Sequence, residues 1–92
     1  MTKKFTASFI IKNDKGLHTR PSTELVKLAS TYKCHIKLIH NKTEVNAKSL
    51  LGILMLAATK GSKIVVEAEG DDAENAVDGL VHLAHNKFNI TY

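Results

Sequence analysis

The sequence lacks tryptophan, and three phenylalanines and two tyrosines are its only aromatic residues. Its one cysteine, Cys34, excludes an intramolecular disulfide and is better explained as a small buried strand residue than as a reactive thiol. A run of the ~20 apolar residues that a membrane-spanning helix needs is also missing, because the longest apolar block, residues 50–58, is shorter and contains Gly52. These absences predict a protein that does not insert into a membrane.

No hydrophobic signal segment follows Met1, since an alternating pattern begins within the first few residues. Hydrophobic residues make up 43% of the chain and charged residues 24%, which is ordinary for a globular protein. A chain of 92 residues is the size of one domain with a thin core. We therefore expect a single cytosolic domain that spans residues 1–92.

The formal net charge is +4, and the lysines are scattered along the whole chain. No lysine-rich tail and no RNA-binding signature accompany this charge, so we expect no nucleic-acid partner. A mildly basic surface instead suits an acidic protein partner or a phosphate group.

The spacing of apolar residues predicts seven elements in the order β-α-β-β-α-β-α. Alternating apolar residues predict strands, and apolar residues three or four apart predict helices. Asp71 and Glu74 resemble a capping box at the start of the last helix. This order predicts an α+β fold in which helices cover one face of an antiparallel sheet. The strands are expected at residues 5–11, 34–40, 43–46 and 64–69, and the helices at 19–31, 50–57 and 73–84.

Residues 16–22 read Gly-Leu-His-Thr-Arg-Pro-Ser and place His18 at the predicted start of a helix. A neutral imidazole nitrogen can attack phosphorus and later leave, and Arg20 supplies a planar cation suited to phosphate oxygens. Backbone N–H groups in the first helical turn, where Pro21 fits and Thr19 adds a hydroxyl, favour an anion. On spacing alone, a capping or surface histidine and a solvated arginine are the more usual interpretation. With that alternative open, the segment is our candidate phosphoryl-accepting site.

The other histidines give a weaker indication of a site. His82 and His85 lie three residues apart on the last predicted helix and could approach one ligand. No carboxylate or cysteine completes a metal site there, so a solvated helix face is the better interpretation. We predict no metal and no cofactor.

The helix predicted over residues 50–57 is apolar on nearly every side, and Ser49 immediately precedes it. A small domain cannot surround such a helix, so some of its side chains should reach the surface and form a docking site. Ser49 has two interpretations. Its hydroxyl can be an ordinary N-cap, or it can be a phosphorylation site whose charge alters the adjoining surface.

Two segments, residues 16–21 and 47–52, resemble the active-site and regulatory motifs of HPr, the histidine-containing phosphocarrier family of the bacterial phosphoenolpyruvate-dependent sugar phosphotransferase system. Their separation, the order of elements and the chain length are similar too. The resemblance implies an open-faced β-sandwich with a four-stranded antiparallel sheet under three helices. It also implies that His18 accepts phosphate on Nδ1 from phosphorylated Enzyme I and passes it to an Enzyme IIA, and that Arg20 helps to hold and transfer it.

The resemblance assigns further roles outside the histidine loop. Ser49 matches the serine that HPr kinase/phosphorylase modifies in lineages with that enzyme, and Gly52 is of the type found in serine-regulated members. Ser22 stands where a small alanine is usual, which a first turn should tolerate. Partner docking is implied for an apolar group and two basic positions, namely Leu50, Leu51, Leu54, Lys27 and Lys48.

We therefore predict a monomeric phosphocarrier that acts stoichiometrically and is not an enzyme. A regulatory protein of the same fold, acting mainly through partner binding and Ser49 phosphorylation, is the alternative. A third possibility, a small ligand-binding α+β domain without phosphoryl transfer, is disfavoured because both His18 and Arg20 are present.

Overall fold

The elements form a sheet layer and a helix layer in a computed structural model that describes residues 3–90. The predicted order and fold class are confirmed, and one further short 3₁₀ turn follows the last helix. Within residues 3–90, no helix combines the length and apolar character that crossing a bilayer would require. The elements are β1 (Lys4–Ile10), α1 (Thr19–Ala29), β2 (His35–His40), β3 (Thr43–Asn46), α2 (Leu50–Met55), β4 (Lys63–Glu69), α3 (Ala73–His85) and the turn η1 (Lys87–Asn89).

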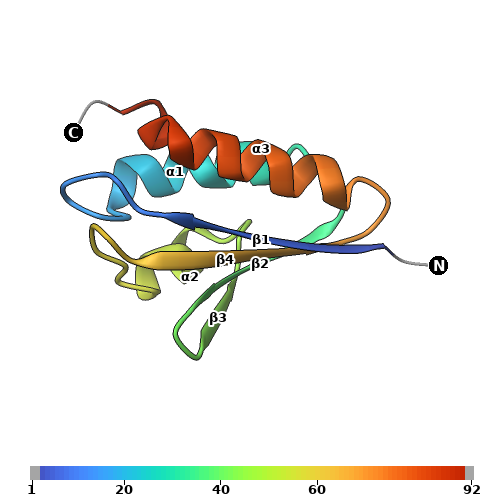
Figure 1. Cartoon of the computed structure of the whole chain (residues 1–92), viewed down its shortest axis with the longest axis horizontal. Coiled ribbons are helices and arrows are strands. Elements are labelled where there is room, and N and C mark those ends of the chain that lie inside the picture. The colour runs from blue at the N-terminus through green and yellow to red at the C-terminus, as the bar shows by residue number, and fades with distance from the viewer. Residues whose placement is uncertain (1–2, 91–92) are drawn as a thin grey trace.

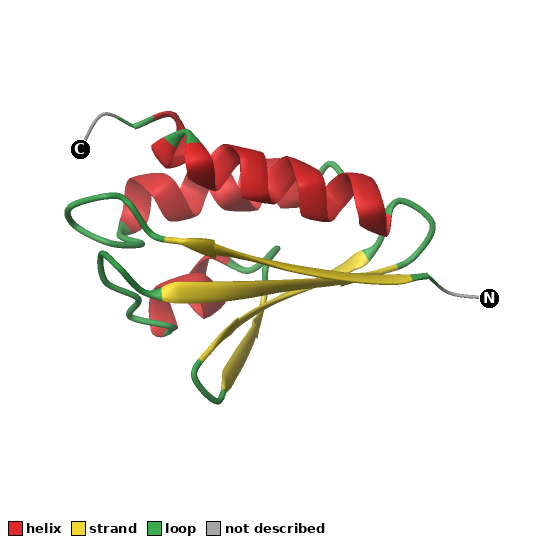
Figure 2. Ribbon diagram, viewed as in Figure 1, coloured by secondary structure: helices red, strands yellow, loops and turns green. Residues whose placement is uncertain are grey.

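The four strands form one antiparallel sheet in the order β1-β4-β2-β3. Figure 1 shows α1 and α3 side by side along one face of this sheet. The shorter helix α2 packs against α1 and β3. Figure 2 shows the resulting arrangement of a helical layer over strands, which leaves the opposite face of the sheet open.

The core lies between the two layers and follows the alternation of the strands. Register pairs Phe9 with Ile64 and Leu38 with Val66, so that apolar side chains of neighbouring strands share the helix-facing side. All four of these side chains are buried. The facing stripes of α1 and α3 are buried as well, which confirms the helical spacing, with Leu25, Ala29, Ala76, Leu80 and Ala84 at their centre.

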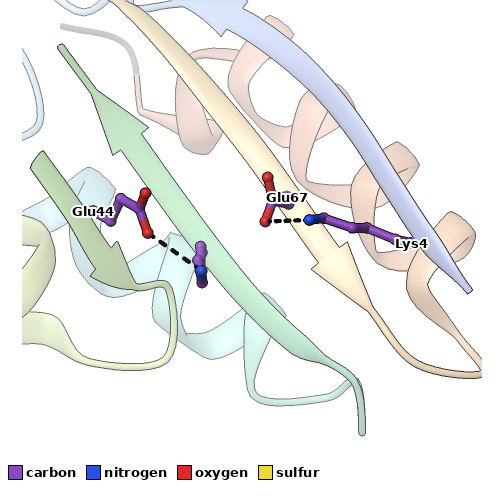
Figure 3. Close-up of polar contacts among 4 residues, drawn as sticks. Lys4, Glu44 and Glu67 are labelled. Carbon is purple, nitrogen blue, oxygen red and sulfur yellow. Dashed lines mark hydrogen bonds and ion pairs between the residues drawn. The ribbon is translucent and has the colours of Figure 1, made fainter. Parts of the chain in front are cut away.

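The open face of the sheet carries cross-strand ion pairs, shown in Figure 3. Lys4 Nζ lies 3.2 Å from Glu67 Oε1, and Lys37 Nζ lies 3.2 Å from Glu44 Oε1. Such partly exposed pairs contribute about 0–1 kcal/mol each. The stability of the sheet therefore depends mainly on its covered face.

Two helices end earlier than their apolar spacing predicts. Helix α1 ends at Ala29. Just beyond its end, the Thr31 hydroxyl donates a 2.6 Å hydrogen bond to the Leu28 carbonyl. Helix α2 ends at Met55, since Ala57 has a φ of 49° that no right-handed helix can continue.

The capping box expected at Asp71 and Glu74 is wrong. Asp72 is the residue before α3, and its side chain makes no cap hydrogen bond. Its carboxylate instead accepts hydrogen bonds from the backbone N–H groups of Lys33 at 2.8 Å and Cys34 at 3.0 Å. The bond from Lys33 is the main reason that the pKa of Asp72 lies below its usual range. This carboxylate ties the start of α3 to the chain entering β2.

The turn η1 was not expected from the sequence, and three consecutive non-glycine residues in it have a left-handed backbone. The φ angles are 53° at Lys87, 56° at Phe88 and 62° at Asn89. Each costs about 1–2 kcal/mol, so the surrounding contacts must hold the turn in place. Phe88 is fully buried and lies edge-on to Phe9, with ring centroids 5.9 Å apart.

Candidate functional site

The loop between β1 and α1 is fixed to the segment that follows α2. Leu17 donates a backbone hydrogen bond of 2.9 Å to the Ala58 carbonyl. Gly16, which precedes it, has a φ of 68°, and a Cβ atom at this position would lie 2.3 Å from the Ala58 oxygen. Only glycine satisfies both constraints. This close contact fixes the backbone just before His18.

His18 is the N-cap residue of α1, and its backbone is extended. Its carbonyl accepts the first helical hydrogen bond from the Ser22 N–H group at 3.1 Å. The imidazole makes no capping hydrogen bond to the helix. The sequence-based placement of His18 at a helix start is therefore confirmed.

The two ring nitrogens of His18 have different surroundings. Nδ1 lies 3.2 Å from the Gly16 carbonyl oxygen, and the side chain as a whole is half-buried. Nε2 has less than 1 Å² of accessible surface. Nε2 is therefore shielded from a reacting group in this conformation, and Nδ1 is the candidate acceptor. Reaction there requires the tautomer that carries its proton on Nε2.

The first turn of α1 offers an anion a favourable electrostatic environment. Thr19 and Arg20 are exposed, Pro21 is buried in the first turn, and this turn contains no acidic residue. The helix dipole and the N–H groups of the first turn favour negative charge near His18. A groove of about 320 Å³ runs beside this turn and is lined by Thr19, Arg20, Thr23, Glu24, Asn89 and Ile90.

Ser22 has a structural part in the site that the sequence did not reveal. Its side chain is fully buried, and its hydroxyl donates a 3.1 Å hydrogen bond to the carbonyl of Leu17. The position is thus more than a tolerated substitute for alanine, because it holds the peptide immediately before His18.

We expect Ser22→Ala to lower the free energy of unfolding by about 1–2 kcal/mol, because the Leu17 carbonyl loses a buried donor. Urea unfolding followed by circular dichroism measures this loss. Thr23→Ala is a matched control, since its hydroxyl also donates to a backbone carbonyl, at 2.7 Å from Thr19 O, but on the exposed side of α1. Equal stability of the two variants would contradict the role of Ser22.

The capping role of Ser49 is confirmed. Its hydroxyl accepts a 3.1 Å hydrogen bond from the Gly52 N–H group at the start of α2. Little space surrounds Gly52, where a Cβ atom would lie 3.2 Å from Ser49 Oγ and 3.3 Å from Val45 Cβ. Ile53 is fully buried and anchors the helix.

Helix α2 presents an exposed apolar patch, which we define as Leu50, Leu51 and Met55 and call the α2 patch. These side chains are 37%, 69% and 70% exposed, whereas Leu54 is half-buried. Sequence reasoning missed Met55 as a surface residue. Its position four residues after Leu51, on the same helix face, is the signal that could have identified it.

The two lysines expected around this surface have different surroundings. Lys27 is exposed on α1 and forms an ion pair with Glu24 at 3.3 Å. Lys48 is half-buried, and its ammonium donates a 2.7 Å hydrogen bond to the Tyr32 carbonyl. The charge of Lys48 is therefore directed toward the end of α1, while that of Lys27 remains at the surface.

The His18 loop and α2 lie at the same end of the molecule (Figure 1). Helices α1 and α2 are packed against each other, and the Leu17–Ala58 hydrogen bond joins the segments that flank them. The fold thus brings the candidate phosphoryl-accepting histidine and the α2 patch together, although 31 positions separate His18 from Ser49 in the sequence (49 − 18 = 31).

Cys34 and the C-terminal histidines stay outside this site. Burial, followed by the hydrogen bond to Asp72, raises the pKa of the Cys34 thiol to about 11, so the thiol is protonated at neutral pH. His82 Nε2 lies 3.2 Å from Asn86 Nδ2 on the exposed side of α3. Among residues 3–90, no three histidine, cysteine or carboxylate side chains are grouped as metal ligands would be.

Comparison with known proteins gives concordant matches. A family model described as "PTS HPr component phosphorylation site" matches residues 5–86. The phosphocarrier protein HPr of Cupriavidus necator is 41% identical over 78 residues, which cover 85% of this chain and 88% of that protein. The HPr of Xylella fastidiosa strain 9a5c is 39% identical over 80 residues, or 87% and 90% of the two chains. The crystal structure of HPr-C-His from Thermoanaerobacter tengcongensis superposes with a TM-score of 0.91 at 38% identity, covering 96% of this chain and 99% of that one.

Proposed function

This chain belongs to the HPr family of phosphocarrier proteins of the phosphotransferase system, and we propose that it accepts a phosphoryl group on His18 from phosphorylated Enzyme I and passes it to an Enzyme IIA. The observation that carries the proposal is the position of His18. It is the N-cap of a helix whose first turn has no acidic residue and contains Arg20. A protein of this kind is consumed and regenerated in each cycle, so it is a carrier and not a catalyst.

The proposed transfer exchanges one phosphorus bond for another at Nδ1 of His18. The Nδ1 lone pair forms the N–P bond as the bond between phosphorus and the Enzyme I donor breaks, and the donor retains that electron pair. The proton of the ring stays on Nε2. Nδ1 also moves away from the Gly16 carbonyl, which lies 3.2 Å from it in the unphosphorylated chain. The reverse exchange hands the group to the acceptor on Enzyme IIA.

Charge neutralisation is the main task of the surrounding residues, because phosphoryl transfer depends largely on positioning and electrostatics. The Arg20 guanidinium can donate to phosphate oxygens, and the N–H groups of the first turn of α1 can do the same. Thr19 adds an exposed hydroxyl at the same helix end.

We assign partner docking to the α2 patch, together with Leu54 and the exposed charge of Lys27. Apolar side chains at this exposure are typical of protein contact sites, and α2 lies at the same end of the molecule as the His18 loop (Figure 1). Lys48 contributes through its hydrogen bond to Tyr32, which holds the segment before Ser49 against the end of α1.

The proposal is tested by incubating the chain with phosphoenolpyruvate and Enzyme I and measuring its intact mass. We expect one added phosphoryl group, which should leave again when an Enzyme IIA is supplied. Omission of Enzyme I is the control. A chain that gains no phosphate from active Enzyme I would contradict the proposed function.

We further propose that HPr kinase/phosphorylase regulates the carrier by modifying Ser49. Negative charge at this N-cap suits the α2 helix dipole, so the fold should tolerate it, while the adjoining α2 patch becomes less attractive to an acidic partner.

Ser49→Asp should therefore slow Enzyme I-dependent phosphorylation about tenfold at subsaturating carrier, which corresponds to ~1.4 kcal/mol. Ser49→Asn is the matched control, because it retains a capping side chain without the charge. Initial rates for both variants give the comparison. If the two variants react at the same rate, charge at this position does not control docking.

A further inference from the structure

We propose that Asn13 and Phe88 are positioning residues, which brace the His18 loop against the left-handed turn η1 near the C-terminal end of the chain. This inference rests on the proposed function of His18. Asn13 and Phe88 lie outside the recognised motifs, and their contacts determine where the imidazole lies.

Asn13 connects the turn to the loop through both its side chain and its backbone. The residue is fully buried, and its Nδ2 donates a 3.0 Å hydrogen bond to the Lys87 carbonyl. Its own carbonyl accepts a 3.0 Å hydrogen bond from the Gly16 N–H group. The Gly16 carbonyl in turn lies 3.2 Å from Nδ1 of His18. Two hydrogen bonds therefore join η1 to the Gly16 peptide, whose carbonyl lies beside Nδ1 of His18.

The turn can serve as a brace because it is itself fixed in the core. Phe88 is fully buried and meets the Phe9 ring edge-on, with an interplanar angle of 73°. Its left-handed backbone, shared with both neighbouring residues, is maintained only where surrounding contacts determine it. The burial of Phe88 and the donor from Asn13 provide such contacts on two sides of the turn.

The same turn also reaches the helix that follows His18. Asn89 and Ile90 line the groove beside the first turn of α1, together with Thr19 and Arg20. Because Ile90 is buried, its side chain is packed into the protein at this wall of the groove. The C-terminal turn thus contacts the segments on both sides of His18, the loop before it and the helix after it.

A brace of this kind affects the rate of transfer without taking part in it. Asn13 and Phe88 touch none of the reacting atoms, and each acts through the position of the Gly16 peptide or of α1. Small displacements of a reacting group slow transfer strongly, because attack needs close alignment of the reacting atoms. Loosening the turn should therefore reduce the rate of phosphorylation more than it reduces binding of Enzyme I.

The test compares Asn13→Ala with the wild-type chain in Enzyme I-dependent phosphorylation and in NMR spectra of the His18 imidazole. We expect the maximal rate to fall about tenfold with little change in KM, since Asn13 is fully buried and lies beyond the reach of Enzyme I. The chemical shifts of the His18 ring should change as well, and the Gly16 amide should exchange faster with solvent.

A matched control separates positioning from lost stability. Val66→Ala removes buried side-chain atoms from the centre of β4, away from the loop, and should lower stability while leaving the His18 ring chemical shifts unchanged. Phe88→Leu loosens the turn while retaining an apolar anchor, and it makes the same test if Asn13→Ala does not fold. Its transfer rate and its His18 ring chemical shifts should change in the same direction as those of Asn13→Ala.

Wild-type transfer rates and wild-type His18 ring chemical shifts in both Asn13→Ala and Phe88→Leu would overturn the inference. Failure of the proposed function looks different, because the wild-type chain itself would then gain no phosphate. In that case the His18 ring chemical shifts and the Gly16 amide exchange still decide whether the turn positions the loop.

Discussion

His18→Ala should abolish the phosphate gain that phosphoenolpyruvate and Enzyme I produce in the wild-type chain. The substitution removes the nitrogen lone pair that forms the N–P bond, and no neighbouring side chain in the first turn of α1 can replace it. Thr19 offers a hydroxyl, but a neutral hydroxyl is a poor nucleophile without an adjacent base. Intact mass spectrometry of the chain after incubation measures the effect. We expect no phosphorylated His18→Ala chain above the detection limit.

The control for this result is a histidine elsewhere on the surface. His82→Ala removes an exposed imidazole from α3 and should leave the phosphate gain unchanged. The bond formed should also be acid-labile, as expected for phosphate on nitrogen and not for phosphate on Ser49. An acid-labile phosphate of normal stoichiometry on His18→Ala would refute the assignment of the acceptor.

The parts of this fold that the sequence predicts well are those set by local patterns. Alternation of apolar residues located β1, β2 and β4, because one face of the sheet is buried and a one-residue slip would expose it. Ser49 was recognised as a cap since the partner of its hydroxyl, the Gly52 N–H group, lies only three residues away. His18 was placed at a helix start on equally local grounds, with Pro21 in the first turn.

The features that escaped prediction depend on residues far apart in the chain. The left-handed turn at Phe88 exists because this ring is buried against Phe9, and no pattern in residues 87–89 indicates that contact. A capping box was expected at Asp71 and Glu74, but Asp72 precedes α3, and its carboxylate accepts hydrogen bonds from two N–H groups just before β2. The role of Asn13 is likewise invisible to local patterns, since its partner is the carbonyl of Lys87, 74 residues away.

The site itself shows the same division. The identities of His18 and Arg20 were predicted from a short motif, whereas their surroundings were not. The resemblance marks Ser22 only as a tolerated substitution, whereas its buried hydroxyl donates to the Leu17 carbonyl. Met55 was overlooked because the helix is apolar on nearly every side, and the sequence alone does not show which side faces solvent. Helix faces are decided by packing, in this case by the burial of Ile53.

Arg20→Ala should slow phosphoryl transfer by about 10²–10³-fold in both directions while leaving the fold intact. The guanidinium is the fixed cation nearest to His18 in sequence, and loss of one such group from a transfer site typically has an effect of this size. Because Arg20 is exposed, its removal should change the free energy of unfolding by no more than about 0.5 kcal/mol. Rapid-quench measurement of phosphate transfer from Enzyme I, with urea unfolding in parallel, separates the two quantities.

Two variants distinguish a specific role of Arg20 from a general effect of charge. Arg20→Lys keeps the charge but loses the planar donor fork, so its rate should lie between those of Arg20→Ala and the wild type. Lys37→Ala changes the net charge by the same amount on the open face of the sheet, where the lysine pairs with Glu44. It should transfer at the wild-type rate if steering by overall charge is unimportant. Equal slowing by Lys37→Ala and Arg20→Ala would mean that long-range attraction to an acidic partner, and not contact with the phosphoryl group, explains the arginine at the start of α1.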